Sequence, residues 1–181
     1  FLIMFFKNLK TSILAVTSIL ALSLQVYAKD LAVSFIDIGQ GDSELIELPE
    51  GKNILIDAGD KEGSAKLINY LKARKIKNID LVIISHPHLD HYGGLLKVVK
   101  EFPIGQVYES GAPTSSTTYL KLLRTFAEKK IKFGISRKNQ ELKYENGINL
   151  KIIAPEDPLL INTKSDANNA SVVAKLTYNK V

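Results

Sequence analysis

The chain has 181 residues and is 45% hydrophobic, which is enough for one domain with a sizeable core and excludes global disorder. It contains no cysteine, and this excludes disulfide bonds and cysteine metal ligands. Its formal net charge of +5 is compatible with a polyanionic substrate but does not by itself indicate one.

The first residues have the pattern of a secretory signal peptide. Lys7 and Lys10 give a basic start, an apolar stretch covers residues 13–24, and a small side chain stands at the cleavage point, Ala28. We therefore expect residues 1–28 to be a signal peptide that is cleaved after Ala28. The protein is then expected to be extracytoplasmic, either periplasmic or secreted.

An uncleaved signal that anchors the protein in a membrane is the alternative. Ser18 and Ser23 interrupt the apolar run and leave it short for a full span, which favours cleavage. Residues 1–3, which precede Met4, are expected to reflect a misplaced start or a fragment boundary. Removal of the signal lowers the formal charge from +5 to +3 and leaves residues 29–181 as one folded domain.

The remainder of the chain alternates between strand and helix signals. Short apolar or alternating runs bounded by glycine, proline and asparagine predict strands, and apolar residues at helical spacing predict helices. Strands are expected at residues 31–37, 43–48, 53–57, 81–84, 106–109, 131–135, 148–153 and 171–178, and helices at residues 64–75, 95–101 and 119–129. Residues 155–169 are expected to form a polar loop. This order predicts a layered α/β protein with a mixed sheet.

All three histidines of the chain lie in one loop, residues 85–94, directly after the buried strand expected at 81–84. Pro87 disfavours helix for the residue before it, so His86 and His88 stand two apart on an extended backbone and can point to the same side. Asp90 and His91 follow on the next turn. Imidazole and carboxylate groups are ligands for zinc, iron and manganese, so the loop suits two adjacent metal ions. A polar surface loop that happens to be rich in histidine is the alternative interpretation.

The pattern H-x-H-x-D-H at the end of a strand resembles the signature of the metallo-β-lactamase fold superfamily. The resemblance implies an α/β fold of the αββα sandwich type, with two sheets back to back and helices outside. It implies that His86 and His88 bind a first divalent metal ion, and that Asp90 and His91 bind a second, with Asp90 also in the catalytic machinery. Zinc is the expected metal, with manganese and iron as alternatives.

Three further stretches resemble the ComEC-type branch of this superfamily, which is named after the extracytoplasmic metallo-hydrolase domain of the competence DNA-uptake channel. They are the opening strand and turn at residues 35–43, the next strand at 54–59, and the late asparagine-serine strand at 168–173. Gly39 and Gly41 permit a tight turn, which is a plain hairpin or part of the site. Asp57 would cap a turn on local grounds, whereas the resemblance makes it a buried carboxylate that orients the metal loop.

The sequence departs from the superfamily in one respect. The superfamily usually supplies a further histidine after the loop, a bridging aspartate from a later Gly-Asp turn and a last histidine, but no histidine follows His91 here. We therefore expect the chain to be incomplete at its C-terminal end, with part of the metal site missing and little activity in the fragment itself.

The function that the resemblance implies is an exported metal-dependent hydrolase. Two metal ions would activate a water molecule for attack on a phosphodiester bond, in a small molecule or in nucleic acid. Two alternatives stay open. One is hydrolysis of a β-lactam, lactone or thioester by the same pair of ions. The other is a non-catalytic extracytoplasmic binding domain with a degenerate metal site.

Overall fold

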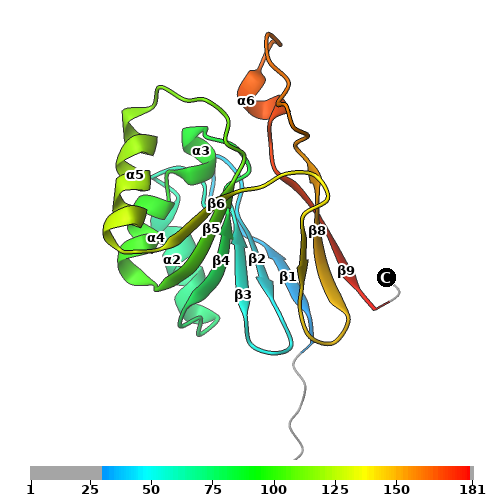
Figure 1. Ribbon diagram of the computed structural model, residues 1–181. Coiled ribbons are helices and arrows are strands. Elements are labelled where there is room, and N and C mark those ends of the chain that lie inside the picture. Colours follow the sequence, from blue (N-terminus) through cyan, green and yellow to red (C-terminus); the bar gives the residue numbers. More distant parts are fainter. Residues whose placement is uncertain (1–29, 180–181) are drawn as a thin grey trace, which may run out of the picture.

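The computed structural model describes residues 30–179, which form two sheets with helices against one of them (Figure 1). The strands of the larger, six-stranded sheet lie in the order of the chain. They are β1 (Ala32–Phe35), β2 (Glu44–Glu47), β3 (Asn53–Ile56), β4 (Ile79–Ile83), β5 (Ile104–Glu109) and β6 (Lys132–Ile135). The first three pair antiparallel and the rest pair parallel, so the predicted mixed sheet is confirmed.

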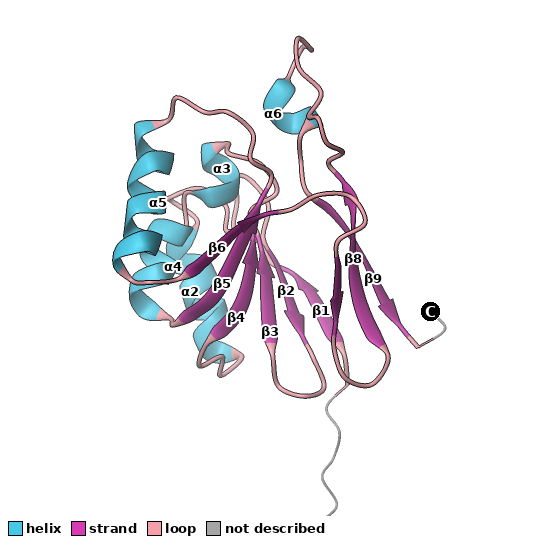
Figure 2. Ribbon diagram, viewed as in Figure 1, coloured by secondary structure: helices cyan, strands magenta, loops and turns pink. Residues whose placement is uncertain are grey.

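Three helices connect the parallel strands and cover one face of the sheet (Figure 2). They are α2 (Ser64–Ala73), α4 (Leu95–Glu101) and α5 (Thr117–Glu128). Their apolar stripes, which include Leu71, Val98 and Phe126, pack on Val82 and Val107 of the sheet. This side of the molecule therefore has a closed apolar core, as the helical spacing predicts.

The opposite face of the sheet packs on a second, three-stranded antiparallel sheet of β7 (Glu141–Lys143), β8 (Ile148–Ala154) and β9 (Val173–Tyr178). From Leu81 to Ile83, the sequence of strand β4 is continuously apolar because both faces of the strand are buried. Leu81 and Ile83 face the second sheet and contribute to a core with Leu150, whereas Val82 faces the helices. Successive residues of a strand point to opposite faces, so a central strand covered on both faces needs apolar residues throughout.

Most predicted elements are confirmed, and three short ones differ from the expectation. Strand β7 was not predicted because its sequence is mostly charged, and it forms by pairing with β8 across a turn. Helix α6 (Asp166–Asn169) lies in the segment expected to be a loop, and Asp166 accepts hydrogen bonds from the backbone and hydroxyl of Thr163. Helix α3 (Leu89–Tyr92) falls inside the predicted metal loop.

The predicted signal peptide, residues 1–28, lies outside the described residues. Among residues 30–179, no helix combines the length and the apolar content that crossing a membrane requires.

Candidate metal centre

The candidate site lies where the parallel strands β3 and β4 end. Ile56 and Ile83 are paired in the register of the two strands, and Asp57 donates its backbone N–H to the carbonyl of Ile83. The carboxyl ends of parallel strands meet at one edge of a sheet, so the residues that follow them lie side by side. Asp57 and Ser85 are brought together in this way from positions 28 residues apart.

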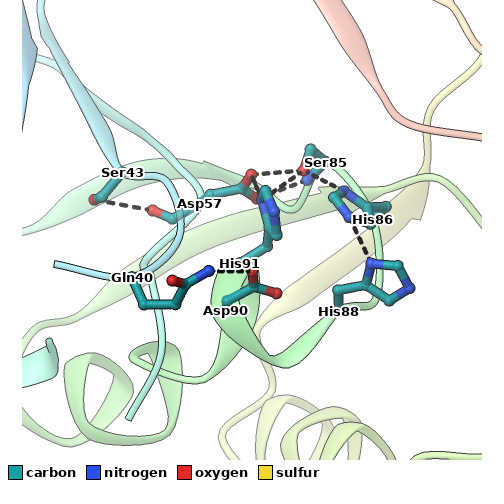
Figure 3. A network of polar contacts seen from close by, with 8 residues as sticks. All are labelled: Gln40, Ser43, Asp57, Ser85, His86, His88, Asp90 and His91. Carbon is teal, nitrogen blue, oxygen red and sulfur yellow. Dashed lines mark hydrogen bonds and ion pairs between the residues drawn. The ribbon is translucent and has the colours of Figure 1, made fainter. Parts of the chain in front are cut away.

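Asp57 is the central acceptor of the site (Figure 3). It is 2% exposed, and its carboxylate accepts hydrogen bonds from the Ser85 backbone N–H at 2.8 Å and from the Ser85 hydroxyl at 2.5 Å. It also lies 2.7 Å from Nδ1 of His91. This hydrogen bond raises the pKa of His91, although burial acts against it. A proton on Nδ1 leaves Nε2 of His91 with a free lone pair, as a metal ligand requires.

The three imidazole rings lie together, as the sequence predicts. Nε2 of His86 is 3.0 Å from Nδ1 of His88, and the rings of His86 and His91 are 4.1 Å apart between centroids. Burial, followed by the neighbouring His91 and His88, lowers the pKa of His86 to about 4. His86 is therefore neutral at physiological pH, which is the protonation state that binds metal.

The His86 and His88 nitrogens fit one metal ion. A tetrahedral zinc with the usual bond length holds two nitrogens about 3.3 Å apart, and the 3.0 Å separation of these two nitrogens is close to that value. Asp90 lies beside them on α3, where its carboxylate accepts a hydrogen bond from Nε2 of Gln40 at 3.3 Å. Burial raises the pKa of Asp90, but the bond from Gln40 and the nearby histidines lower it overall, so Asp90 is ionised.

The structure brings one pair of predicted ligands, His86 and His88, to a common position, and it does not gather the other two around one point. Within residues 30–179, no group of three or more histidine, cysteine, aspartate or glutamate side chains is placed around a single ion position. His86 and His88 share one position, whereas Asp90 faces Gln40 and the Nδ1 atom of His91 faces Asp57.

The glycine-rich turn before β2 packs directly on the metal loop. A Cβ atom on Gly41 would collide with the backbone carbonyl of Asp90, and its φ of +94° also favours glycine. The sequence left open whether this turn is a plain hairpin or part of the site. The contacts of Gly41 and Gln40 place it against the site, beside Asp90.

Sequence reasoning missed Ser85, Gln40 and Glu44. Ser85 joins Asp57 to the histidine cluster, since its hydroxyl also lies 2.9 Å from Nδ1 of His86. Its position between a buried strand and the first histidine was the available signal. The sequence around Glu44 contains no such signal, because nothing local shows that this side chain faces a cavity.

A cavity of about 510 Å³ opens beside the histidine cluster, between the two sheets. Asp57, Ser85, His86 and His91 line one end of it. Its walls come from β1 and β2 on one side and from β8, β9 and the residues before β9 on the other.

Known proteins resemble this chain in sequence and in fold. The family model of the metallo-beta-lactamase superfamily matches residues 36–160. ComE operon protein 3 of Bacillus subtilis (strain 168) is 26% identical over 158 residues, which are 78% of this chain and 20% of that protein. The anaerobic nitric oxide reductase flavorubredoxin of Aeromonas salmonicida (strain A449) is 35% identical over 60 residues, 33% of this chain and 12% of that protein.

Among solved structures, MEM-A1, a subclass B3 metallo-beta-lactamase isolated from a soil metagenome library, has a TM-score of 0.55 at 16% identity. The alignment covers 82% of this chain and 55% of MEM-A1. At this identity the similarity shows the fold alone. The chain thus spans about half of this structural relative and a fifth or less of the two curated relatives.

Proposed function

Because this chain belongs to the metallo-beta-lactamase superfamily, we propose that it is a metal-dependent hydrolase of phosphodiester bonds. Proteins of this superfamily are mostly hydrolases and generally bind two metal ions. The observation that carries the proposal is the cluster of His86, His88 and His91 around the buried hub of Asp57 and Ser85. A neutral His86 paired with His88 at metal-binding separation is hard to explain as ordinary surface structure.

Each side chain of the site has a distinct task in this proposal. His86 and His88 would hold one ion, and Asp90 and His91 the other. Two such ions, when bound, acidify a water molecule and neutralise charge on the oxygens of the reacting group. Asp57 fixes the tautomer of His91, and Gln40 holds the carboxylate of Asp90 in place. Zinc is the proposed metal, since imidazole and carboxylate ligands suit it; manganese and iron are the alternatives to be tested.

The choice of phosphodiester rests on the ComEC-type stretches at residues 35–43, 54–59 and 168–173, to which the similarity to ComE operon protein 3 adds support. Nucleic acid is the proposed polymeric form of the substrate, and this part of the proposal rests on family analogy. Export through a cleaved signal at residues 1–28 belongs to the same proposal. N-terminal sequencing of the mature protein checks it, and a product that retains the apolar segment contradicts it.

The test of the proposal is metal content together with hydrolysis. The full-length mature protein is expected to bind close to two zinc ions and to hydrolyse bis-p-nitrophenyl phosphate in preference to a chromogenic β-lactam or thioester, whereas residues 29–181 by themselves are expected to show little activity. The double variant His86→Ala, His88→Ala is expected to lose mainly one ion and the activity. The variant Asp90→Asn should lose activity, whereas Asp37→Asn should not, because Asp37 is exposed and accepts a hydrogen bond from the Gly39 backbone N–H, away from the histidine cluster.

Unchanged metal content in the double variant would contradict the assignment of His86 and His88. Metal binding without any hydrolysis would favour the second candidate function, a non-catalytic binding domain. Within residues 30–179, no three candidate ligands surround one point, and this is the observation that favours that candidate.

A further inference from the structure

The chain is rich in lysine where it enters the parallel strands β4, β5 and β6. These strands run in one direction, so their amino ends meet at one edge of the sheet, opposite to the edge of the candidate metal centre. Six lysines stand at or shortly before the first residues of these strands, and all six are exposed: Lys75, Lys77, Lys100, Lys129, Lys130 and Lys132. We call the surface that they form the lysine edge.

Contacts between neighbouring turns hold the lysine edge together. The side-chain amide of Asn53 donates a hydrogen bond to the carbonyl of Asn78, and the backbone N–H of Ile79 donates to the carbonyl of Pro103. Further along, Lys100 and Lys129 line one surface pocket. The lysines therefore lie along one continuous edge of the sheet.

The acidic side chains near this edge do not neutralise its lysines. Glu101 pairs with Lys72, and Glu47 pairs with Arg74. Within residues 30–179, no lysine of the lysine edge forms an ion pair. Three further acidic residues lie near it: Asp30, Glu50 and Glu128. The six lysines outnumber them, so the edge carries a net positive charge.

The other end of the sheet is acidic. Four aspartates stand in the loops beside the candidate metal centre or on α3: Asp37, Asp42, Asp60 and Asp90. Strand β5 has six residues, and at about 3.3 Å per residue the two edges are about 20 Å apart. In Figure 1 the lysine edge is at the lower end of the sheet, and α3 lies near the upper end. An anionic surface is therefore attracted to one end of the molecule and repelled by the other.

Helix dipoles explain only part of this arrangement. Lys100 lies in the last turn of α4 and Lys129 directly follows α5, where a cation interacts favourably with the helix C-terminus. Lys77 lies in the turn before β4 and Lys132 lies on β6, so neither stands at a helix end. The lysines that remain unexplained belong to the same edge as the others.

The chain also enters the fold at the lysine edge. Ala32, at the start of β1, pairs with Glu47, and a surface pocket is lined by Asp30, Arg74 and Lys75 together. In the sequence, the apolar stretch of residues 13–24 comes shortly before Asp30. If export proceeds through that stretch, as proposed above, the lysine edge is the part of the fold that lies next to the membrane.

We propose that the lysine edge binds the anionic surface of a lipid bilayer and that the candidate metal centre faces away from it. Lysine suits such a partner, because its long flexible side chain carries a mobile point charge that is attracted to anionic headgroups. Nucleic acid is a weaker explanation. A strand bound at this edge would lie about 20 Å from the histidine cluster, and the nearby Arg74 is already held by Glu47.

Sedimentation of the full-length mature protein with lipid vesicles tests the proposal. Vesicles of phosphatidylcholine mixed with the anionic lipid phosphatidylglycerol are expected to bind the protein, whereas vesicles of phosphatidylcholine alone are not. Binding should disappear in about 1 M salt, where the Debye length falls to about 3 Å. These comparisons use the wild type, so they test the proposal without any variant.

The triple variant Lys77→Gln, Lys100→Gln, Lys129→Gln removes half of the lysine edge. Each lysine near an anionic bilayer strengthens binding about fivefold, so this variant should bind the mixed vesicles about 100-fold more weakly. Its three positions are exposed, and urea denaturation is expected to show that it folds like the wild type.

The matched control is the triple variant Lys66→Gln, Lys121→Gln, Lys164→Gln. Lys66 and Lys121 stand in the first halves of α2 and α5, and Lys164 comes shortly before α6. All three are exposed and form no ion pair within residues 30–179. The control loses the same net charge away from the lysine edge, so it should bind the mixed vesicles like the wild type.

Several results would overturn the inference. They are equal binding to both kinds of vesicle, binding that persists in high salt, and equal affinities of the two triple variants. A lysine-edge variant that binds vesicles normally but duplex DNA more weakly would make this edge a nucleic-acid surface instead. Vesicle binding without hydrolysis of bis-p-nitrophenyl phosphate rejects the proposed hydrolase alone, and hydrolysis without vesicle binding rejects this inference alone.

Discussion

The two faces of the six-stranded sheet differ in how completely they are covered. On the helical side, α2, α4 and α5 close a continuous apolar core, in which Leu71 and Phe126 are almost fully buried. On the other side, the second sheet covers the central strands but leaves β1 open, so that Phe35 is 82% exposed. The open side contains the cavity and the closed side contains most of the core.

The candidate metal centre lies at the boundary between these two regions. Helix α3 shows this within one turn. Tyr92 packs into the closed core, where its hydroxyl lies 2.7 Å from that of Ser116, whereas Asp90 and His91 belong to the candidate site. The candidate ligands Asp90 and His91 are thus anchored from the closed side while the cavity opens on the other. A site of this kind keeps its geometry on rigid elements and leaves space for a substrate.

The two faces of the sheet would not differ in packing if substitutions on both of them lowered stability equally. Phe126→Ala on the closed side is expected to lower the free energy of unfolding by about 3–5 kcal/mol, because the buried ring leaves a cavity in a packed core. Val173→Ala on the open side should change it by less than about 0.5 kcal/mol, because that side chain is 45% exposed. Urea denaturation of both variants measures the difference. Similar losses would show that the open side is as well packed as the helical side.

Asp57 joins the two regions, so a substitution there tests how the candidate site depends on both. In Asp57→Asn, the amide would donate to Nδ1 of His91, so the proton of the ring moves to Nε2 and blocks it as a ligand. Metal affinity should fall about 10–100-fold, as is usual when the partner of a ligating histidine is removed. Competition with a chelator measures this affinity. Asp37→Asn is the control, and an unchanged affinity in Asp57→Asn would mean that Asp57 is only structural.

The smallest expected effect concerns Glu109, a buried carboxylate on the closed side, next to α5. Burial raises its pKa, although the Gly111 backbone, the hydroxyl of Tyr119 and Arg137 act against this. The folded state then holds the proton to higher pH than the unfolded state. Its contribution to stability is present below the ordinary pKa of glutamate and is lost as pH rises through the folded pKa.

Glu109→Gln should therefore remove this loss of stability with rising pH. Urea denaturation at pH 4, 6 and 8 is expected to show the wild type losing stability relative to the variant as pH increases. A difference between the two proteins that stays constant with pH would show that the carboxyl group titrates alike in the folded and unfolded states.

The sequence by itself predicted the elements and the metal loop, because those signals are local. Apolar spacing along α2 and α5, the apolar run of β4 and the position of His86, His88, Asp90 and His91 after that run can all be read within short windows. The resemblance to a family also follows from such windows, and it gave the fold and the proposed pairing of these residues with metal ions.

The family resemblance had already pointed to Asp57, but only the tertiary structure decided how distant residues complete the site. Asp57 meets Ser85 and His91 because the register of β3 and β4 places the ends of these two strands side by side. Gly41 packs on Asp90 across nearly fifty residues, and Glu44 faces the cavity because the second sheet lies opposite β2. Such contacts depend on strand register and on the packing of one sheet on another, and neither leaves a periodic signal in the sequence around a single residue.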